Sequence, residues 1–177
     1  MILLLLGIAV VLGDQLTKEW IRGAYPLHEA HAVLPGFFDL THVQNTGAAW
    51  GMFSGNSLAL AGVALIALAA LMVFRRRIFT PGWGGSVVAG LLLGGIVGNL
   101  LDRVRLGYVT DFLDFYHGTW HFPAFNVADA AITAACILHV LFTFLQSLKA
   151  AETKSGPAPE PDAAPAETTE TQGESEP

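Results

Sequence analysis

Long apolar stretches alternate with short polar segments through the first 148 residues. A helix crosses a bilayer with about 20 mostly apolar residues. Four stretches approach that length, at about residues 2–22, 58–74, 84–103 and 127–148. The first stays apolar only to Leu12 and reaches full length by continuing through Asp14 and Lys18. It lacks the basic start and the small-residue cleavage site of a signal peptide, so we interpret it as a retained helix. The pattern predicts an all-α membrane protein with four transmembrane helices.

The segments between these stretches predict the orientation of the chain. Three consecutive arginines at 75–77 separate the second stretch from the third, and Lys149 and Lys154 follow the fourth. Because cytoplasmic loops are enriched in Lys and Arg, we expect both termini on the cytoplasmic side. Residues 23–57 and about 104–125 then lie outside the membrane, and we expect Asp111 in the loop just before the fourth stretch. Short apolar runs around Pro35 and Gly36, within residues 32–43, indicate small strands there.

The composition supports a membrane protein and shows that residues 149–177 differ from the rest of the chain. Of the 177 residues, 53% are apolar and 14% are charged, against a charged share of about 25% in globular domains. Residues 149–177 hold two Lys, seven Asp or Glu and five of the nine prolines. We therefore predict a membrane domain over residues 1–148 and a disordered, acidic, Pro-rich cytoplasmic tail over residues 149–177. The single Cys136 excludes an intrachain disulfide, and no basic patch indicates nucleic acid as a partner.

Ionisable and amide side chains gather at the outer end of the predicted helices, where they mark a candidate functional site. The group comprises Asp14, Asn99, Asp102, Arg103, Asp111 and Asp129. Structural explanations remain open for most of them. The spacing of the residues at 99, 102 and 103 places them on one helical face, which could simply end at the headgroups. Asn126 is a good N-cap with an acid three residues later, and Asp14 with Lys18 forms an i, i+4 pair that we interpret as structural.

Asp111 and Asp129 are the pair with the most useful chemistry. Two carboxylates brought close together at a membrane edge do not both ionise easily, so one keeps its proton. The charged partner can then take a proton from water while the other donates to a carbonyl oxygen, as in aspartic proteases. This chemistry needs neither a metal nor a cofactor. Sequence spacing permits the two residues to meet but does not require it.

Other chemistries have weaker support. His117 and His121, with Asp114, form a minor candidate metal site. Cys136 and His139 are three residues apart with no evident third group, so we expect them to be core residues. A small transporter or proton-conducting protein would distribute its acids through the bilayer depth, whereas here they gather at one face. A purely structural membrane protein would leave this gathering unexplained.

Five motifs, in order, resemble those of the bacterial lipoprotein signal peptidases (signal peptidase II). They are DQLTK at 14–18, NTGAAWG at 45–51, GGIVGNLLDR at 94–103, VTDF at 109–112 and FNVAD at 125–129. The resemblance covers about residues 8–145. It implies a four-helix aspartic endopeptidase of the bacterial inner membrane, with its active site near the outer face. It also implies a small extracytoplasmic β-sheet, which residues 30–57 would supply.

The resemblance also implies a substrate and roles for particular residues. The substrate is a prolipoprotein whose cysteine carries diacylglycerol, and cleavage occurs on the amino side of that cysteine. Asp111 and Asp129 match the catalytic dyad, and Asp14 matches an acid at the end of the first helix. The polar residues that line the site match Asn45, Asn99, Arg103 and Asn126. Membrane lipid is an expected partner, and globomycin is the expected inhibitor.

Overall fold

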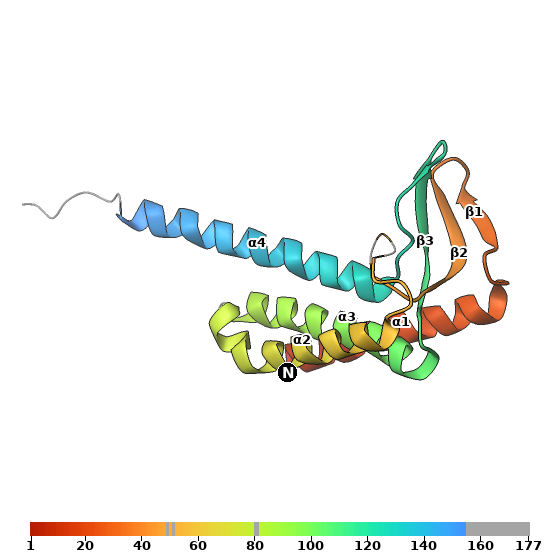
Figure 1. The fold of residues 1–177 in the computed structure, drawn as a ribbon. Coiled ribbons are helices and arrows are strands. Elements are labelled where there is room, and N and C mark those ends of the chain that lie inside the picture. Colours follow the sequence, from red (N-terminus) through yellow and green to blue (C-terminus); the bar gives the residue numbers. More distant parts are fainter. Residues whose placement is uncertain (49, 51, 80–81, 155–177) are drawn as a thin grey trace, which may run out of the picture.

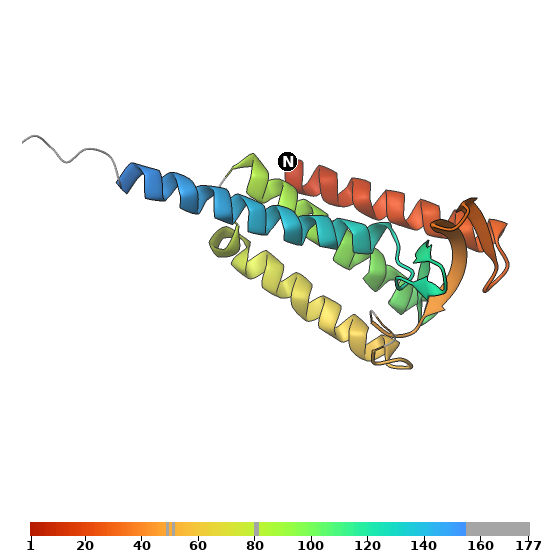
Figure 2. The same cartoon turned by 90° about the horizontal axis from the view of Figure 1, so that it is seen from above.

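The structure is a computed structural model that describes residues 1–48, 50, 52–79 and 82–154. Its elements follow one another as α1 (Ile2–Ala24), β1 (Ala30–Leu34), β2 (Phe38–Asn45), α2 (Ser57–Ile78), α3 (Trp83–Leu106), β3 (Val109–His117), β4 (Trp120–His121) and α4 (Val127–Lys154). The long helices run in roughly one direction, and the sheet stands at one end of them (Figure 1). Seen from above, α1 and α2 lie on opposite sides of the pair formed by α3 and α4 (Figure 2).

Three helices of the described part, α2, α3 and α4, are long and apolar enough to cross a membrane. α1 is as long, with 23 residues, but Asp14 and Lys18 and two further charges lie in its second half. Large apolar side chains cover the outer surface of the helices. Ile66 and Val73 on α2, for example, are each 71% exposed. A surface of this kind suits contact with lipid.

Two helix ends differ from the sequence expectation. α2 continues to Ile78, four residues past the predicted end, and includes the three arginines. α4 continues through Lys154, so the prediction of disorder is wrong for residues 149–154. Residues 149–154 are mostly helix formers, and the first helix-breaking residues beyond them are Gly156 and Pro157. Residues 155–177, the rest of the predicted tail, lie outside the described residues.

The small sheet is antiparallel, with the strand order β1-β2-β3-β4. Only β1 and β2 come from the segment at 30–57 that was expected to supply the sheet. β3 and β4 come from the segment between α3 and α4, which the sequence analysis treated as a loop. β2 pairs with β3 so that Val43 lies opposite Asp111 and Asn45 lies opposite Val109. The expectation of Asp111 in a loop is therefore wrong, because pairing with β2 makes its segment a strand.

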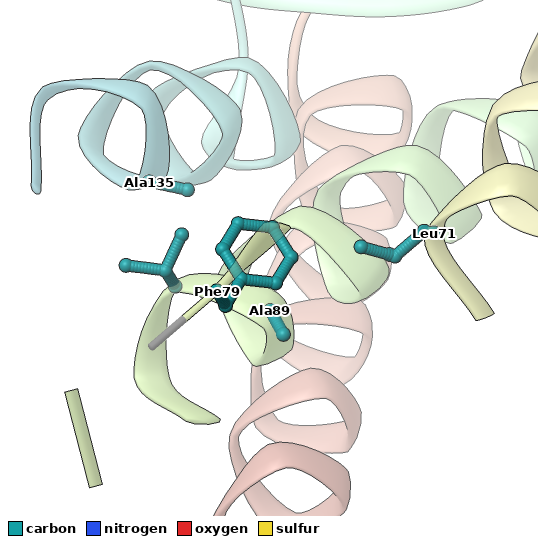
Figure 3. Packing of buried hydrophobic residues seen from close by; sticks show 5 residues of the cluster. Leu71, Phe79, Ala89 and Ala135 are labelled. Carbon is teal, nitrogen blue, oxygen red and sulfur yellow. The ribbon is translucent and has the colours of Figure 1, made fainter. Parts of the chain in front are cut away.

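α3 is the central helix and packs against α1, α2 and α4. Close approach to α1 depends on glycine, because a Cβ at Gly94 would lie 2.6 Å from Cβ of Val10. Toward the other end of the bundle, a small apolar core joins α2, α3 and α4. Figure 3 shows Leu71, Phe79, Ala89 and Ala135 in this core. These contacts fix α3 and α4 relative to each other, and both helices carry candidate site residues.

Candidate active site

A cavity of about 870 Å³ opens where the sheet meets the ends of α3 and α4. Its lining combines polar groups with a larger number of apolar side chains. The polar groups include five residues that the sequence predicted for the site, namely Asn45, Asn99, Arg103, Asp111 and Asp129. The apolar part includes Val43, Phe122, Phe125, Ile132 and Ile137. The cavity therefore offers polar chemistry beside a surface that suits an apolar ligand.

Asp111 is placed in the cavity wall by β3 and is only 2% exposed. Its two carboxylate oxygens each accept a hydrogen bond from an amide. Nδ2 of Asn126 donates to Oδ1 at 2.6 Å, and Nδ2 of Asn45 donates to Oδ2 at 2.9 Å. Burial raises the pKa of Asp111 to about 7, the negative charge of Asp129 adds to the rise, and the two amide donors oppose it. This carboxyl group is therefore able to hold a proton near neutral pH.

Asp129 lies in the first turn of α4 and lines the same cavity. Its Oδ1 accepts a hydrogen bond from Nδ2 of Asn99 at 2.7 Å. Its Oδ2 accepts one from the backbone N–H of Asn126 at 3.3 Å, while its own N–H donates to Oδ1 of Asn126 at 3.0 Å. This reciprocal pair is a capping box. Asp129 therefore caps the start of α4, as the sequence allowed, and also lines the cavity.

Asn126 connects the two carboxylates. It is fully buried, and its Nδ2 donates to Asp111 while its backbone N–H donates to Asp129. The same Nδ2 also lies 3.2 Å from Oδ1 of Asn99. One residue at the start of α4 therefore ties β3 to α3. The structure brings together the two acids whose meeting the sequence only permitted.

Asp14 does not face the cavity but supports it from α1. Its Oδ1 accepts a hydrogen bond from the backbone N–H of Ala128 at 2.9 Å, which fixes the start of α4. Its Oδ2 forms the expected ion pair with Lys18 at 2.8 Å. Both side chains are completely buried. Asp14 therefore holds the segment that carries Asp129.

Arg103 joins α3 to the loop after β2. Its Nη2 donates to the backbone carbonyl of Gly47 at 3.2 Å, and the N–H of Gly47 donates to Oδ1 of Asn45 at 2.9 Å. A Cβ at Gly47 would lie 2.5 Å from the carbonyl oxygen of Met52, so the loop requires glycine there. These contacts fix Asn45 with its Nδ2 toward Asp111.

Lys18 has more partners than its spacing from Asp14 predicted. The ammonium also lies 3.3 Å from Oδ2 of Asp102 and donates to Oδ1 of Asn99 at 2.9 Å. Gln15, for which the sequence predicted no role, donates to both Asp14 and Asp102. The available signal was a lysine within a predicted transmembrane helix, which is itself a reason to expect function.

The weaker candidates lie elsewhere. Nδ1 of His121 is 2.9 Å from Oδ2 of Asp114, away from the cavity lining. No three His, Cys, Asp or Glu side chains in the described ranges are arranged to hold a metal ion. Cys136 is exposed on α4, so its expected place in the core is wrong.

Comparison of the sequence with known protein families identifies the family of this chain. The family model described as "Signal peptidase (SPase) II" matches residues 6–145, a range that contains all the polar residues described above. The chain belongs to the signal peptidase II family. The resemblance seen in the five motifs is confirmed, and the protein is a peptidase with the helices of an integral membrane protein.

Individual relatives support the assignment of this chain to the signal peptidase II family. A protein of Desulforapulum autotrophicum named lipoprotein signal peptidase is 41% identical over 155 residues, which cover 82% of this chain and 95% of the relative. A protein of the same name from Syntrophotalea carbinolica is 45% identical over 134 residues, covering 74% and 83%. A solved structure titled as a bacterial membrane enzyme is 32% identical, with a TM-score of 0.74 over 89% of this chain and 94% of the other. The helix and sheet arrangement is thus similar to that of a solved membrane enzyme.

Proposed function

We propose that this signal peptidase cleaves prolipoproteins on the amino side of a cysteine that carries diacylglycerol, with Asp111 and Asp129 activating the water. The observation that carries the proposal is the shared cavity, in which two carboxylates are linked by Asn126 beside an apolar wall. The relatives' name, lipoprotein signal peptidase, supplies the substrate class. The apolar wall suits the acyl chains, and the polar groups suit the peptide backbone.

In this mechanism Asp111 is the acid and Asp129 is the base. The raised pKa of Asp111 supports a protonated carboxyl group near neutral pH. Asp129 takes a proton from water, the resulting hydroxide attacks the scissile carbonyl carbon, and Asp111 donates its proton to the carbonyl oxygen. When the C–N bond breaks, the proton on Asp129 passes to the leaving amine, and the hydroxyl proton of the intermediate returns to Asp111. Both acids end in their starting states.

The proposal also fixes the placement of the protein in the membrane. α1 is the fourth transmembrane helix, because its 23 residues match the length of the others and Asp14 and Lys18 in its second half are buried against α3. The arginines at the end of α2 lie on the cytoplasmic side of the bacterial inner membrane. Both termini are cytoplasmic, and the sheet and the cavity lie near the outer face. A lipidated cysteine remains in the bilayer, so its scissile bond lies at the same height as the cavity.

The test is cleavage of a purified diacylated precursor, followed by the shift of the product on a gel. Asp111→Asn and Asp129→Asn should each abolish cleavage while the enzyme accumulates normally in the membrane. Asp114→Asn is the matched control, because Asp114 lies on the same strand but contacts His121 rather than the cavity, and it should cleave normally. Full activity in either dyad variant would reject the mechanism. Globomycin should inhibit the enzyme, and EDTA should leave it active.

A further inference from the structure

Lys18 has more partners than an ordinary ion pair requires. The side chain is completely buried, and its ammonium lies 2.8 Å from Oδ2 of Asp14 and 3.3 Å from Oδ2 of Asp102. Its third contact is a hydrogen bond of 2.9 Å to Oδ1 of Asn99. An ammonium has three donors, so all three are used. Two of them neutralise acids, and the third points toward the candidate site.

Two donors face Oδ1 of Asn99 and hold its amide in one orientation, namely the Lys18 ammonium at 2.9 Å and Nδ2 of Asn126 at 3.2 Å. The two ends of an amide have almost the same shape, so only their partners decide the orientation. An ammonium can only donate, so Oδ1 of Asn99 must face Lys18. Nδ2 is then directed at Oδ1 of Asp129, to which it donates at 2.7 Å. The reverse orientation would place Nδ2 against the ammonium and Oδ1 against a carboxylate, and both contacts would be repulsive.

We propose that Lys18 is a positioning residue for the reaction, which orients Asn99 to donate to Asp129 and thereby favours the carboxylate form of the base. This inference rests on the proposed function, in which Asp129 is the base. Lys18 touches neither acid of the dyad and does not line the cavity. It acts through Asn99 and through its positive charge, which is little screened in a buried cluster.

Other charges near Asp129 must be considered in any pH measurement. Asp14 acts on it from α1, Arg103 from α3 and Asp111 from β3. Asp102 balances Lys18 from α3, and Arg22 lies 3.9 Å from that carboxylate. Removal of Lys18 alone would leave Asp14 and Asp102 with one cation fewer. A charge-matched comparison is therefore needed.

The experiment compares Lys18→Met/Asp102→Asn with the wild type and with Asp102→Asn. The double variant has the same net charge as the wild type, because it removes one positive and one negative charge, and its comparison with Asp102→Asn isolates the loss of Lys18. Cleavage of the diacylated precursor is measured from pH 5 to pH 9. We expect kcat to fall about tenfold to a hundredfold in the double variant, in line with the loss of a residue that orients a catalytic group. The acidic limb of kcat/KM should also move about one pH unit upward, since the base loses a favourable charge.

Two further variants separate positioning from general damage. Gln15→Met removes hydrogen bonds to Asp14 and Asp102 without touching Asn99, so it should lower thermal stability but leave the pH profile unchanged. In an Asn99→Ala background, Lys18→Met should lower kcat less than in the wild type, because the route through Asn99 is already absent and only the effect of the charge remains. If Lys18→Met variants do not fold, Lys18→Arg becomes the deciding variant. It keeps a donor-only cation and should retain the wild-type pH profile.

Several results would overturn the inference. One is a folded double variant with the kcat and pH profile of Asp102→Asn. Another is an equal loss of kcat on removing Lys18 with and without Asn99. A third is a folded Lys18→Arg enzyme with a shifted profile. Failure of the proposed function is a separate result, since it would appear as retained cleavage in Asp111→Asn or Asp129→Asn, whatever happens at Lys18.

Discussion

The contact between α1 and α3 at Gly98 gives a sharp test of how the site is supported. A Cβ at this position would lie 2.6 Å from Oδ2 of Asp14 and 3.2 Å from Cβ of Ala128. Ordinary contact begins at 3.4 Å, so the carboxylate would have to move by 0.8 Å (3.4 − 2.6). Asp14 cannot easily move, because Lys18 and the N–H of Ala128 hold its two oxygens. Gly98→Ala therefore has to weaken the ion pair or displace the start of α4.

The magnitude follows from two opposing effects. Overpacking a tight contact costs about 1–3 kcal/mol, and weakening a buried ion pair adds to that cost. The better helix propensity of alanine returns about 1 kcal/mol. We expect a net loss of roughly 2–3 kcal/mol, which is a fall in melting temperature of roughly 5–10 °C for a chain of this size. Cleavage should also fall, because the displaced segment carries Asp129.

The assay is thermal unfolding of the purified enzyme in detergent, together with cleavage of a diacylated precursor. Gly13→Ala is the matched control, because it adds the same methyl group to α1 at a position with nothing within 4 Å. That variant should be as stable as the wild type or slightly more stable. Equal melting temperatures for Gly98→Ala and Gly13→Ala would refute the reasoning. So would full cleavage by a Gly98→Ala enzyme that has lost stability, since α4 would then not depend on this contact.

Three further predictions follow from the same contacts. The pKa of Asp111 is raised from 3.8 to about 7. Between these pH values the folded state binds more protons than the unfolded state, so the free energy of unfolding falls as the pH rises from about 4 to 7. Asp111→Asn should therefore raise the melting temperature at pH 8 more than at pH 5, and an equal change at both would contradict the assignment. Arg103→Gln removes the charged bond to the Gly47 carbonyl and should lower kcat/KM at least tenfold with little change in melting temperature, whereas wild-type kinetics would show that the guanidinium does not hold the loop. Removal of residues 151–177 should leave cleavage intact, and a clear loss in the same gel assay would assign the tail a role.

Much of this architecture was readable from the sequence because it depends on local chemistry. Runs of apolar residues specify helices wherever lipid or a helical neighbour covers them. Asn126 and Asp129 form a capping box from positions three residues apart, which any helix start would bring together. The same locality explains the Asp14 and Lys18 pair on one turn of α1. The motifs also identified the family, since their order is a property of the chain.

Tertiary structure decided which of these residues meet. The pairing of β3 with β2 converted an expected loop into a strand and directed Asp111 into the cavity, and no local pattern specifies a partner that lies more than 60 residues away. The link from Lys18 to Asn99 spans 81 residues and exists because glycines let α3 approach α1 closely. Helical periodicity reports which face of a segment is apolar, but packing alone determines what that face touches. For that reason the sequence identified the residues of the site, while the contacts between helices and strands determined the partner of each one.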